Sequence, residues 1–398
     1  MGLLFGSRPA ARDSARALTL DSLGVSRGTA GSSGQPATPQ TSLRFSAVWA
    51  ALRLRADLIS TLPVDVFRTA PDGAQVSAPG TRLFKRPADD ILWPEWLYST
   101  QMDLDRYGNC FGLIEARDAG YPVQIEPWAA GEVTVRLKGR RIVKYRYDRT
   151  EYDPGQVWHE RQYTVAGYRI GLSPIAYAAW TVGAALSAQE FSLDWFANGA
   201  APSGTLRHTQ EPNLDTKILE AAKARFKIAT ANRDLFVTGS EWEFTPSAVD
   251  ANSAQFLQAQ GHSAVDVARF IGVPATAIDA AVTGQSLTYS NLTMQQLHLL
   301  VNFLAAPIIR REWALTANAL PAPRFAKFNT DALLRLDPTG RTQLMAAQID
   351  AWMTDPDEAR KLNNLPPLTP EQIALLTLRR KATAKATTTT PDEGDDTP

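Results

Sequence analysis

A long apolar segment with a proline inside it constrains the fold of this chain more than any other feature. Residues 291–319 form a long helix candidate, and Pro307 lies near its middle. Proline has no backbone N–H, so it cannot donate to the carbonyl of Phe303, and a bend is expected there. The polar loop before this helix has no Lys or Arg, and it consists of Thr283, Gly284, Gln285, Ser286, Leu287 and Thr288. The segment therefore predicts a bent helix preceded by a small neutral loop.

The size and charge of the chain exclude several classes of protein. Its 398 residues, 44% of them hydrophobic, predict two or three subdomains with real cores. Lys plus Arg and Asp plus Glu each number 41, so no overall charge favours nucleic acid or a membrane surface. The longest nearly apolar run, 297–309, has about 13 residues, whereas a membrane span needs roughly 20. We expect a soluble protein without a membrane span, and its first eight residues do not resemble a signal peptide.

Both ends of the chain have the composition of disordered segments. Residues 1–42 are rich in Gly, Ser, Ala, Thr and Pro, and residues 386–398 combine Thr and Pro with acidic residues. Such segments have too few large apolar groups to offset the entropy of ordering them. We therefore expect a disordered N-terminal arm at 1–42 and a disordered acidic tail at 386–398.

The first half of the body predicts helices followed by antiparallel strands. Val48, Ala51, Leu52 and Ile59 repeat at helical spacing, and a second helix over Trp93–Arg106 ends before Gly108. The segments after Gly108 alternate apolar and polar residues between Gly- and Asp-containing turns, which is typical of antiparallel strands.

The second half is predominantly helical. Ser173-Pro174 is an N-cap signal that opens about 25 helical residues, and further helices are predicted at 213–229 and 253–271. Between these two helices lies a predicted hairpin that places Trp242 and Phe244 on one face. Shorter helices follow over 340–385.

Residues that could carry chemistry are scattered rather than clustered. The single cysteine, Cys110, excludes an intrachain disulfide and is expected to be a small buried residue. No histidine pair has metal-ligand spacing, and His262 with Asp266, one helical turn away, is typical of a structural or solvated pair. The glycine-rich motifs that bind dinucleotides or nucleotide phosphates are missing from the sequence. We expect no catalytic residue, no metal and no cofactor.

Two charged patterns have alternative interpretations. Residues 139–149 concentrate Arg140, Arg141, Lys144, Arg146 and Arg149 around Tyr145 and Tyr147. They can be a strand that contacts phosphates or, more commonly, a sheet with one solvated face and one packed face. Asp103 and Asp105 lie close together on a predicted helix, and we expect them on its exposed surface.

An ordered series of short motifs carries a family resemblance. Ser46-Ala47-Val48-Trp49 begins a helix, Arg106-Tyr107-Gly108-Asn109 precedes a strand, and Gly171-Leu172-Ser173-Pro174-Ile175 opens a helix that ends in Trp195-Phe196-Ala197-Asn198-Gly199. Ala268-Arg269-Phe270-Ile271-Gly272-Val273-Pro274, Thr288-Tyr289-Ser290-Asn291 and Leu333-Leu334-Arg335-Leu336-Asp337 follow in that order. No single motif is specific, but their order and spacing resemble the portal proteins of tailed bacteriophages over nearly all of 43–370.

The resemblance implies an α+β portal-type fold: an α/β wing, a two-helix stem, a short β-hairpin clip, a kinked tunnel helix and a small helical crown. We expect the wing at 43–212, the stem helices at 213–229 and 253–272, and the clip at 230–252. The tunnel loop, the kinked helix and the return to the wing then occupy 273–339, and the crown occupies 340–385. Phe236, Trp242 and Phe244 are implied to lie at a subunit or terminase interface of the clip.

The resemblance also implies a non-enzymatic function and a set of partners. Family members form a ring, usually of twelve subunits, at one vertex of the capsid, through which double-stranded DNA is packaged and ejected without sequence specificity. The implied partners are the terminase large subunit, the major capsid or scaffold protein and the head–tail connector. The implied location is the virion, after assembly in the cytoplasm of the bacterial host.

Two other functions remain as alternatives. A head–tail connector or minor head protein is generally smaller or lacks the stem–clip–stem order, so ring size and channel geometry discriminate it. A hydrolase or nuclease needs an acidic or histidine cluster, and metal-dependent DNA cleavage by the pure protein discriminates it.

Overall fold

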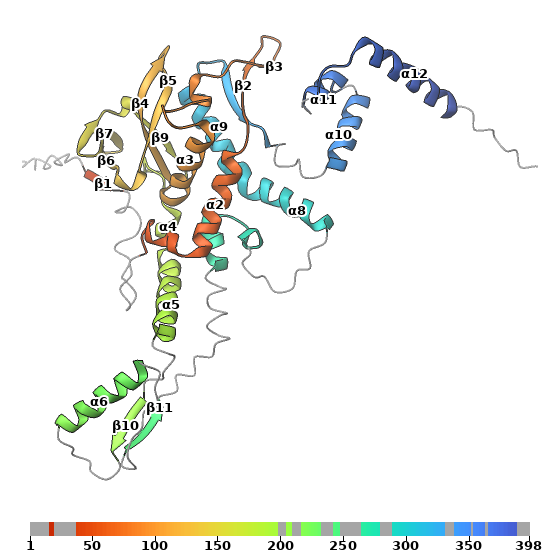
Figure 1. Cartoon of the computed structure of the whole chain (residues 1–398). Coiled ribbons are helices and arrows are strands. Elements are labelled where there is room, and N and C mark those ends of the chain that lie inside the picture. Colours follow the sequence, from red (N-terminus) through yellow and green to blue (C-terminus); the bar gives the residue numbers. More distant parts are fainter. Residues whose placement is uncertain are drawn as a thin grey trace, which may run out of the picture. The chain divides into compact units, whose positions relative to one another are not determined.

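The computed structural model describes residues 16–19, 37–197, 204–208, 216–231, 242–246, 264–278, 289–330, 338–351, 353–362 and 365–387. The chain divides into two compact units, residues 1–330 and residues 331–398. The first unit combines helices with antiparallel sheets, and the described part of the second is helical (Figure 1). The predicted α+β class is confirmed.

The first unit contains several helices besides its sheets. They are α2 (Ser46–Ser60), α3 (Trp93–Tyr107), α4 (Pro174–Tyr177), α5 (Ala179–Ala197), α6 (Thr216–Ala231), the helical residues 264–271, α8 (Tyr289–Leu299) and α9 (Ala305–Ala319), with a π-helical segment at Leu300–Leu304 between the last two.

The described strands form four antiparallel sheets. β5 (Tyr121–Trp128), β4 (Asn109–Asp118) and β9 (Val157–Arg161) make one, and β12 (Arg324–Phe328), β2 (Val64–Thr69) and β3 (Gln75–Ser77) make another. A third contains β1 (Arg16–Thr19), β6 (Thr134–Lys138), β7 (Arg141–Tyr147) and β8 (Thr150–Tyr152). β10 (Gly204–His208) pairs with β11 (Trp242–Pro246) in the fourth.

A helical core joins segments that are distant in the sequence. Ala51 and Leu52 of α2 are fully buried and pack in one cluster with Val182 of α5 and with Val267 and Ile271 of the 264–271 helix. Burying one such large apolar side chain contributes about 1.5–3 kcal/mol. The first half of α5 and the end of the 264–271 helix are therefore fixed to the same body.

A second core lies between the sheets. Phe111 of β4, Trp128 of β5 and Tyr145 of β7 are buried in one cluster. The Phe111 and Tyr145 rings meet edge to face with centroids 5.9 Å apart, an arrangement that the quadrupoles of two aromatic rings favour. Cys110 is buried at the start of β4, as the sequence predicts.

The prediction that residues 1–42 form a disordered arm is wrong for two of its segments. β1 pairs antiparallel with β6, and Thr41–Arg44 form a 3₁₀ helix in which Ser42 is buried. Gln40 anchors this part by donating from Nε2 to the Tyr107 hydroxyl at 2.7 Å. A strand can add to a sheet edge through main-chain hydrogen bonds, so the scarcity of apolar residues in 1–42 did not prevent pairing.

The sheet partner of Trp242–Pro246 is a segment that the sequence analysis assigned to the wing. β11 pairs with β10, so that His208 lies opposite Trp242 and Leu206 opposite Phe244. The partner strand expected for the hairpin, near 234–237, lies outside the described residues. In the sequence, α6 lies between β10 and β11. A prediction of a local hairpin therefore could not identify β10 as the partner of β11.

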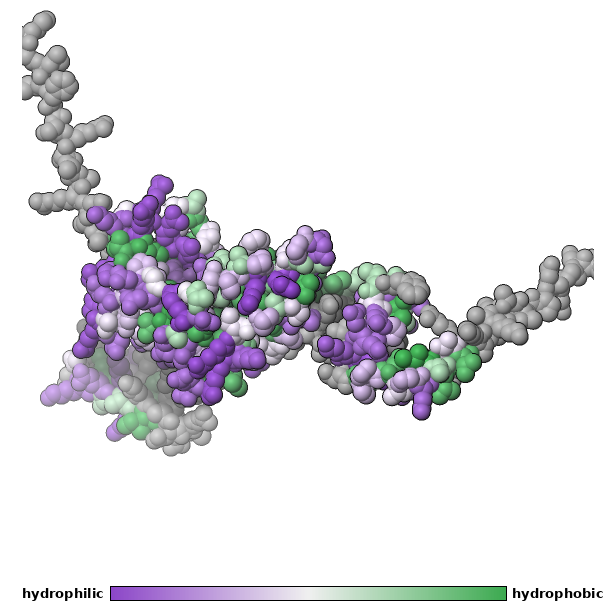
Figure 2. Space-filling model, turned by 90° about the horizontal axis from the view of Figure 1, so that it is seen from above, coloured by the Kyte–Doolittle hydropathy of each residue, from purple (hydrophilic) through white to green (hydrophobic). Residues whose placement is uncertain are grey.

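The described part of the second unit consists of α10 (Pro338–Asp350), α11 (Pro356–Leu362) and α12 (Pro370–Thr387). Apolar side chains remain exposed on α12, at Ile373, Leu375, Leu376 and Leu378. Green apolar residues are correspondingly visible on the surface in Figure 2. The unit begins at 331, nine residues before the predicted crown boundary at 340.

Candidate functional site

The structure describes some of the predicted site residues and not others. The loop residues Thr283–Thr288 and Phe236 lie outside the described residues. Trp242 lies on β11, half-buried, with its ring edge to face against His208 at 5.1 Å. The backbone of Phe244 is on the same strand, and its side chain is outside the described set. Pro307 is buried in the first turn of α9.

The helix that carries Pro307 changes its hydrogen-bond pattern just before the proline. A π-helical segment, Leu300–Leu304, separates α8 from α9, and the Ala305 N–H donates to the Leu300 carbonyl. Figure 1 shows α8 and α9 running in different directions on either side of it. A proline cannot complete the regular i to i−4 pattern, and a π-turn is one way for a helix to accommodate such an interruption. The observed interruption therefore begins one turn before Pro307.

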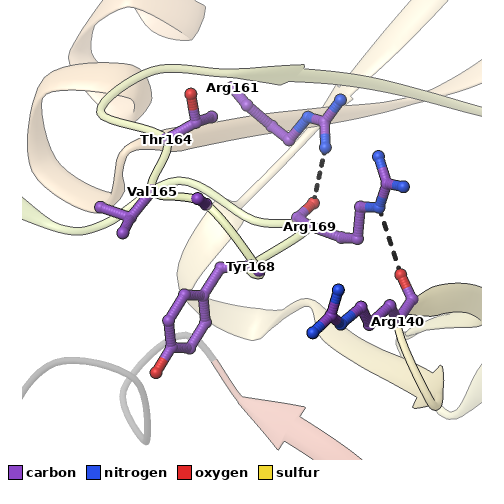
Figure 3. Close-up of a pocket in the computed structure, with 8 residues that line it drawn as sticks. Arg140, Arg161, Thr164, Val165, Tyr168 and Arg169 are labelled. Carbon is purple, nitrogen blue, oxygen red and sulfur yellow. Dashed lines mark hydrogen bonds between the residues drawn. The ribbon is translucent and has the colours of Figure 1, made fainter.

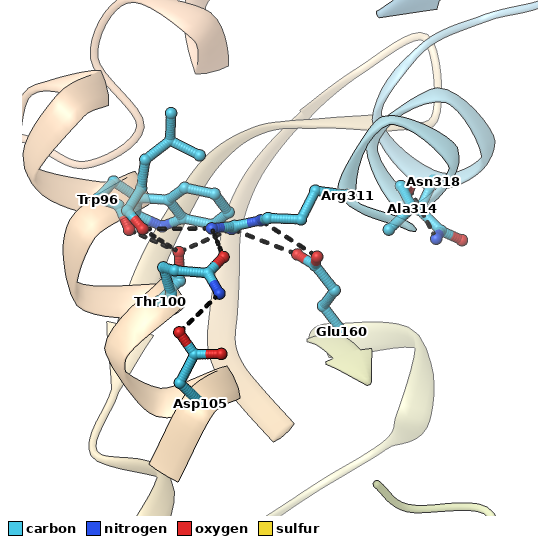
Figure 4. Close-up of polar contacts among 9 residues, drawn as sticks. Trp96, Thr100, Asp105, Glu160, Arg311, Ala314 and Asn318 are labelled. Carbon is cyan, nitrogen blue, oxygen red and sulfur yellow. Dashed lines mark hydrogen bonds and ion pairs between the residues drawn. The ribbon is translucent and has the colours of Figure 1, made fainter. Parts of the chain in front are cut away.

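Arg311 anchors α9 in the protein interior. Its side chain is fully buried, with Nη2 donating to Thr100 Oγ1 at 2.8 Å and Nη1 to the Leu97 carbonyl at 3.2 Å. Its Nε lies 3.2 Å from Glu160 Oε1 of β9, which is also buried. The guanidinium carbon lies 5.7 Å from the centroid of the Trp96 ring. Figure 4 shows Arg311 extending from α9 between α3 and the end of β9.

A second buried arginine holds the end of the 264–271 helix. Arg55 of α2 is 2% exposed, and its Nη1 lies 2.9 Å from Asp105 Oδ1. Its Nη2 donates to the carbonyls of Ile271 and Gly272, where the helix ends in a left-handed glycine. A cation is favourable at a helix C-terminus because the last carbonyls have no intrahelical partner. Arg55 therefore satisfies this helix end with a charge that Asp105 balances.

Gln101 joins the two arginines into one polar network. Its Nε2 donates to Asp105 Oδ2 at 3.0 Å, and its Oε1 accepts from Arg311 Nη1 at 3.4 Å. Tyr163 adds a further link, because its hydroxyl accepts from Arg55 Nη1 at 2.8 Å and its ring lies 6.0 Å from the Arg310 guanidinium. The network thus connects the end of the 264–271 helix with α9 through α3.

Burial determines the ionisation of this network. It raises the pKa of Glu160 even though Arg311 opposes the shift. The pKa of Tyr163 is raised by burial and by Asp105. For Arg55, burial lowers the pKa, but Asp105 and Tyr163 outweigh it and the net shift is upward. The ionic state of each group therefore depends on its partner remaining in place.

Asp103 and Asp105 are not on an exposed helix surface, contrary to the sequence interpretation. Asp105 is fully buried against Arg55. Asp103 accepts from the Ala130 N–H at 3.3 Å, and burial raises its pKa to about 6 despite the nearby Arg106. The spacing of the two residues could not reveal that α2 covers the face of α3 that carries Asp105 and that the 129–133 turn covers the face that carries Asp103.

Two of the sequence motifs meet where α4 begins. Asn109 donates from Nδ2 to the Gly171 carbonyl at 2.8 Å and accepts from the Gly171 N–H at 2.7 Å. Ser173 donates to the Arg106 carbonyl at 2.5 Å and also caps α4 by accepting from the Ala176 N–H at 3.1 Å. The predicted N-cap at Ser173 is confirmed. The helical segment breaks once at Ala178, between α4 and α5, and Gly199 lies outside the described residues.

The His159 ring is half-buried and neutral. Its Nδ1 lies 2.9 Å from the Tyr145 hydroxyl, its Nε2 lies 3.1 Å from Asn109 Oδ1, and its ring stacks on Phe111. Burial, with a smaller effect from Arg161, lowers the pKa of His159 to about 3. It is therefore a structural residue of the β5–β4–β9 sheet.

We expect His159 to make folding sensitive to acid. Between pH 6.5 and pH 3 the unfolded chain takes up a proton at His159 that the folded chain does not, so stability falls as the pH falls, by up to about 1.4 kcal/mol per pH unit. Asp103 acts in the opposite direction between pH 6 and pH 3.8, because its folded pKa is raised. Urea unfolding at pH 7, 6, 5 and 4.5 should show a shallower decline for His159→Gln than for the wild type. Parallel declines for the two proteins contradict this assignment.

Four residues of this network were not among those predicted from the sequence: Arg55, Gln101, Glu160 and Arg311. One signal was available for Arg311, namely its position on the apolar stripe of the helix. It lies three residues after Ile308 and four residues before Leu315, and both of these residues are buried. A charged residue on the apolar stripe of a helix predicts a buried partner. The identity of that partner depends on tertiary contacts.

No metal-binding cluster of three or more His, Cys, Asp or Glu residues occurs among the described residues. Asp266, which the sequence paired with His262, forms an ion pair with Arg269 at 2.5 Å, and His262 lies outside the described residues.

None of the helices in the described parts of the chain is long and apolar enough to cross a membrane.

Comparison with known proteins identifies the family. The phage portal protein family matches residues 46–364. The chain is 27% identical to the portal protein of Enterobacteria phage HK97, covering 84% of this chain and 81% of that protein. It is 28% identical to a probable portal protein of Streptomyces phage phiC31, covering 86% and 79%.

Solved structures agree with this match at the level of the fold. An HK97-family phage portal protein from Corynebacterium diphtheriae superposes with a TM-score of 0.60 and 19% identity, over 77% of this chain and 100% of that chain. A chain from the neck of a native gene transfer agent particle, computed with C12 symmetry, gives a TM-score of 0.53 and 18% identity over 86% and 99%. The family match covers well over half of the sequence, and this chain therefore belongs to the phage portal protein family.

Proposed function

We propose that this portal protein forms a ring, of twelve subunits in the virion, that lies at one capsid vertex and conducts double-stranded DNA without sequence specificity during packaging and ejection. The proposed partners are the terminase large subunit, the major capsid or scaffold protein and the head–tail connector. The chain itself acts without catalysis, and it assembles in the bacterial cytoplasm. Support comes from the family membership and from the ring symmetry of the gene transfer agent neck that it resembles.

The observation that carries this proposal is the exposure of large apolar side chains on the long helices. In the single chain, Trp180 of α5 is 67% exposed, Leu193 of α5 is 70% exposed and Trp313 of α9 is 71% exposed. Buried aromatic anchors dominate the energetics of protein interfaces. Neighbouring copies around a ring provide the cover that a lone chain lacks.

We assign the two stem helices to α5 and the 264–271 helix. The first assignment replaces the predicted range 213–229, and the second lies within the predicted range 253–272. α5 is apolar around much of its circumference, and its first half packs in the helical core beside Val267 and Ile271. The described side chains of α6, by contrast, are exposed or half-buried. The clip then contains β10, α6 and β11.

α8 and α9 fit the role of the kinked tunnel helix. α9 is fixed to the body by Arg311 and by hydrogen bonds to β12, where the Phe328 N–H donates to Glu312 at 2.8 Å. In the preceding loop, residues 283–288 have no charged side chain. Each neutralised phosphate strengthens DNA binding, so a neutral loop suits a channel that contacts moving DNA without holding it.

Ring formation is tested directly by light scattering and negative-stain imaging of the same chromatographic peak. We expect rings of about a dozen subunits with an open centre, and we expect Trp180→Asp to reduce them, because losing an aromatic anchor costs on the order of 2 kcal/mol at every interface. Leu92→Asp is the matched control, since Leu92 is also exposed but precedes α3, where an aspartate suits the helix start.

The outcomes of this experiment are distinct. Rings that persist in Trp180→Asp contradict the α5 interface, whereas equal losses in both variants indicate a general effect of added charge. If the wild type stays monomeric when co-expressed with capsid and scaffold proteins, the ring proposal fails.

A further inference from the structure

Exposed apolar side chains follow one another along α8, the π-helical segment and α9. On α8, Met294 and Leu297 are exposed, and Val301 follows them at helical spacing in the π-helical segment. On α9, Ile309 and Trp313 are exposed one turn apart. We call these five side chains the α8–α9 face.

The π-helical segment brings the two halves of this face into line. About seven residues make two turns of an α-helix, so an unbroken helix would align Ile308 with Val301. A π-turn spans one residue more than an α-turn, and here the Ala305 N–H donates to the Leu300 carbonyl. Ile309 therefore takes the aligned position, and accordingly Ile309 is 49% exposed whereas Ile308 is 2% exposed.

α5 carries a second apolar face. Trp180 and Ala184 are exposed one turn apart, while Val182 and Leu186 on the opposite side of the helix are buried in the helical core. We call Trp180 and Ala184 the α5 face. α5 packs against α4 and the Thr41–Arg44 helix, whereas α9 packs against β12 and β5. The two faces are therefore held by different neighbours and are separate surfaces of the chain.

The charges beside the two faces are opposite in sign. The sequence of α5 contains two charged residues, Glu190 and Asp194, and both are acidic. Beside the α8–α9 face, Arg310 is exposed. Complementary charges guide two surfaces together and disfavour pairing of like with like. Each face therefore suits the other face better than it suits a second copy of itself.

We propose that the α8–α9 face of one copy packs on the α5 face of the next copy around the ring. This inference rests on the proposed ring, and it specifies which surfaces meet there. Two different faces that bind each other make a heterologous contact, which closes into a ring when the rotation between copies allows it. A face that bound its own counterpart would instead make a twofold dimer.

Site-specific cross-linking of the full-length protein tests this contact. Ala184→Cys and Ala306→Cys each place a thiol on one face, because both alanines are exposed and Ala306 lies three residues before Ile309. Both changes are small and add no charge. The native Cys110 is buried, and burial raises the pKa of its thiol, so a bismaleimide leaves it unmodified.

The number of cysteines in each copy determines the expected products. The double variant Ala184→Cys, Ala306→Cys should give a ladder of covalent oligomers on a denaturing gel, because every copy can link to both neighbours. The two single variants, co-expressed, should give covalent dimers and nothing larger, which also excludes a link within one chain. Each single variant alone should give no link. Dimers from a single variant alone overturn the proposal, because they indicate a face that binds itself.

Tyr168→Cys combined with Ala306→Cys is the matched control. Tyr168 is exposed, as Ala184 is, but it lies in the wing loop that lines the pocket of Figure 3. Arg161 donates to the Arg169 carbonyl at 2.9 Å and Arg169 donates to the Arg140 carbonyl at 3.2 Å, so this loop is tied to the sheets. No ladder is expected from the control. A ladder as strong as that of the test variant contradicts a specific contact between the two faces.

Light scattering of the same samples separates this inference from the ring proposal. Rings of wild-type mass without links between positions 184 and 306 overturn the contact and leave the ring proposal in place. If no ring forms even with capsid and scaffold proteins, the ring proposal fails, and the contact between neighbouring copies fails with it.

Discussion

Arg311→Met is expected to lower the free energy of unfolding by about 3–5 kcal/mol, the cost typical of breaking a buried ion pair from one side. The substitution leaves Glu160 buried without its cation and removes the donors to Thr100 and the Leu97 carbonyl. Methionine fills most of the same space, so the loss reports on charge and hydrogen bonding rather than on a cavity. Urea unfolding at pH 7, followed by tryptophan fluorescence, measures it.

Two further variants separate the effect of the Arg311–Glu160 ion pair from the effect of replacing any arginine in this part of α9. Arg310→Met is the matched comparison, because Arg310 neighbours Arg311 on α9 but is exposed. Its contact with the Tyr163 ring is a single exposed cation–π interaction, so a loss of at most about 1 kcal/mol is expected. The double variant Arg311→Met, Glu160→Gln should recover part of the loss, since it removes the unpaired buried charge. A single variant as stable as the wild type, or a double variant no better than the single, contradicts a buried ion pair.

Gly171→Ala is expected to cost about 3 kcal/mol or more, or to prevent folding. A Cβ at this position would overlap the carbonyl oxygens of Gly108 and Gln162, which are backbone atoms on two different segments. The Gly108 segment continues into Asn109, which is bonded to Gly171, and the Gln162 N–H donates to the Gly108 carbonyl at 2.8 Å. Neither segment can move without losing these bonds. Circular dichroism and urea unfolding of the purified variant measure the effect.

Gly155→Ala provides the comparison for this substitution. A Cβ at Gly155 meets no heavy atom within 4 Å, and its φ is not in the left-handed region. Its stability should be unchanged or slightly higher, because alanine restricts the unfolded chain. Equal stability of the two alanine variants contradicts the close approach at Gly171.

Several elements of the fold could be predicted from local patterns. The apolar stripe of α2, the end of α3 before Gly108 and the Ser173 cap of α4 are confirmed. These features arise from helical periodicity and from backbone conformations that one residue type favours, so a few neighbouring residues suffice to specify them. The order of short motifs likewise pointed to the portal family, which the comparison confirms.

Other elements depend on contacts that no short window contains. β1 joins β6 across more than a hundred residues, and β11 pairs with β10 on the far side of α6. Main-chain pairing at a sheet edge makes little demand on side chains, so the sequence pattern of 1–42 gave no warning of a strand. The site residues expected in 283–288 stay predictions, because that loop lies outside the described residues.

The sequence by itself determined the end of α3 before Gly108, the start of α4 after Ser173, the apolar face of α2 and the family to which the chain belongs. Only the tertiary structure decided that Asp105 balances Arg55 at the end of the 264–271 helix and that Arg311 of α9 meets Glu160 of β9. The physical reason is that a charge tolerates burial only beside its partner. Arg311 and Glu160 are separated by about 150 residues, and folding alone brings them together.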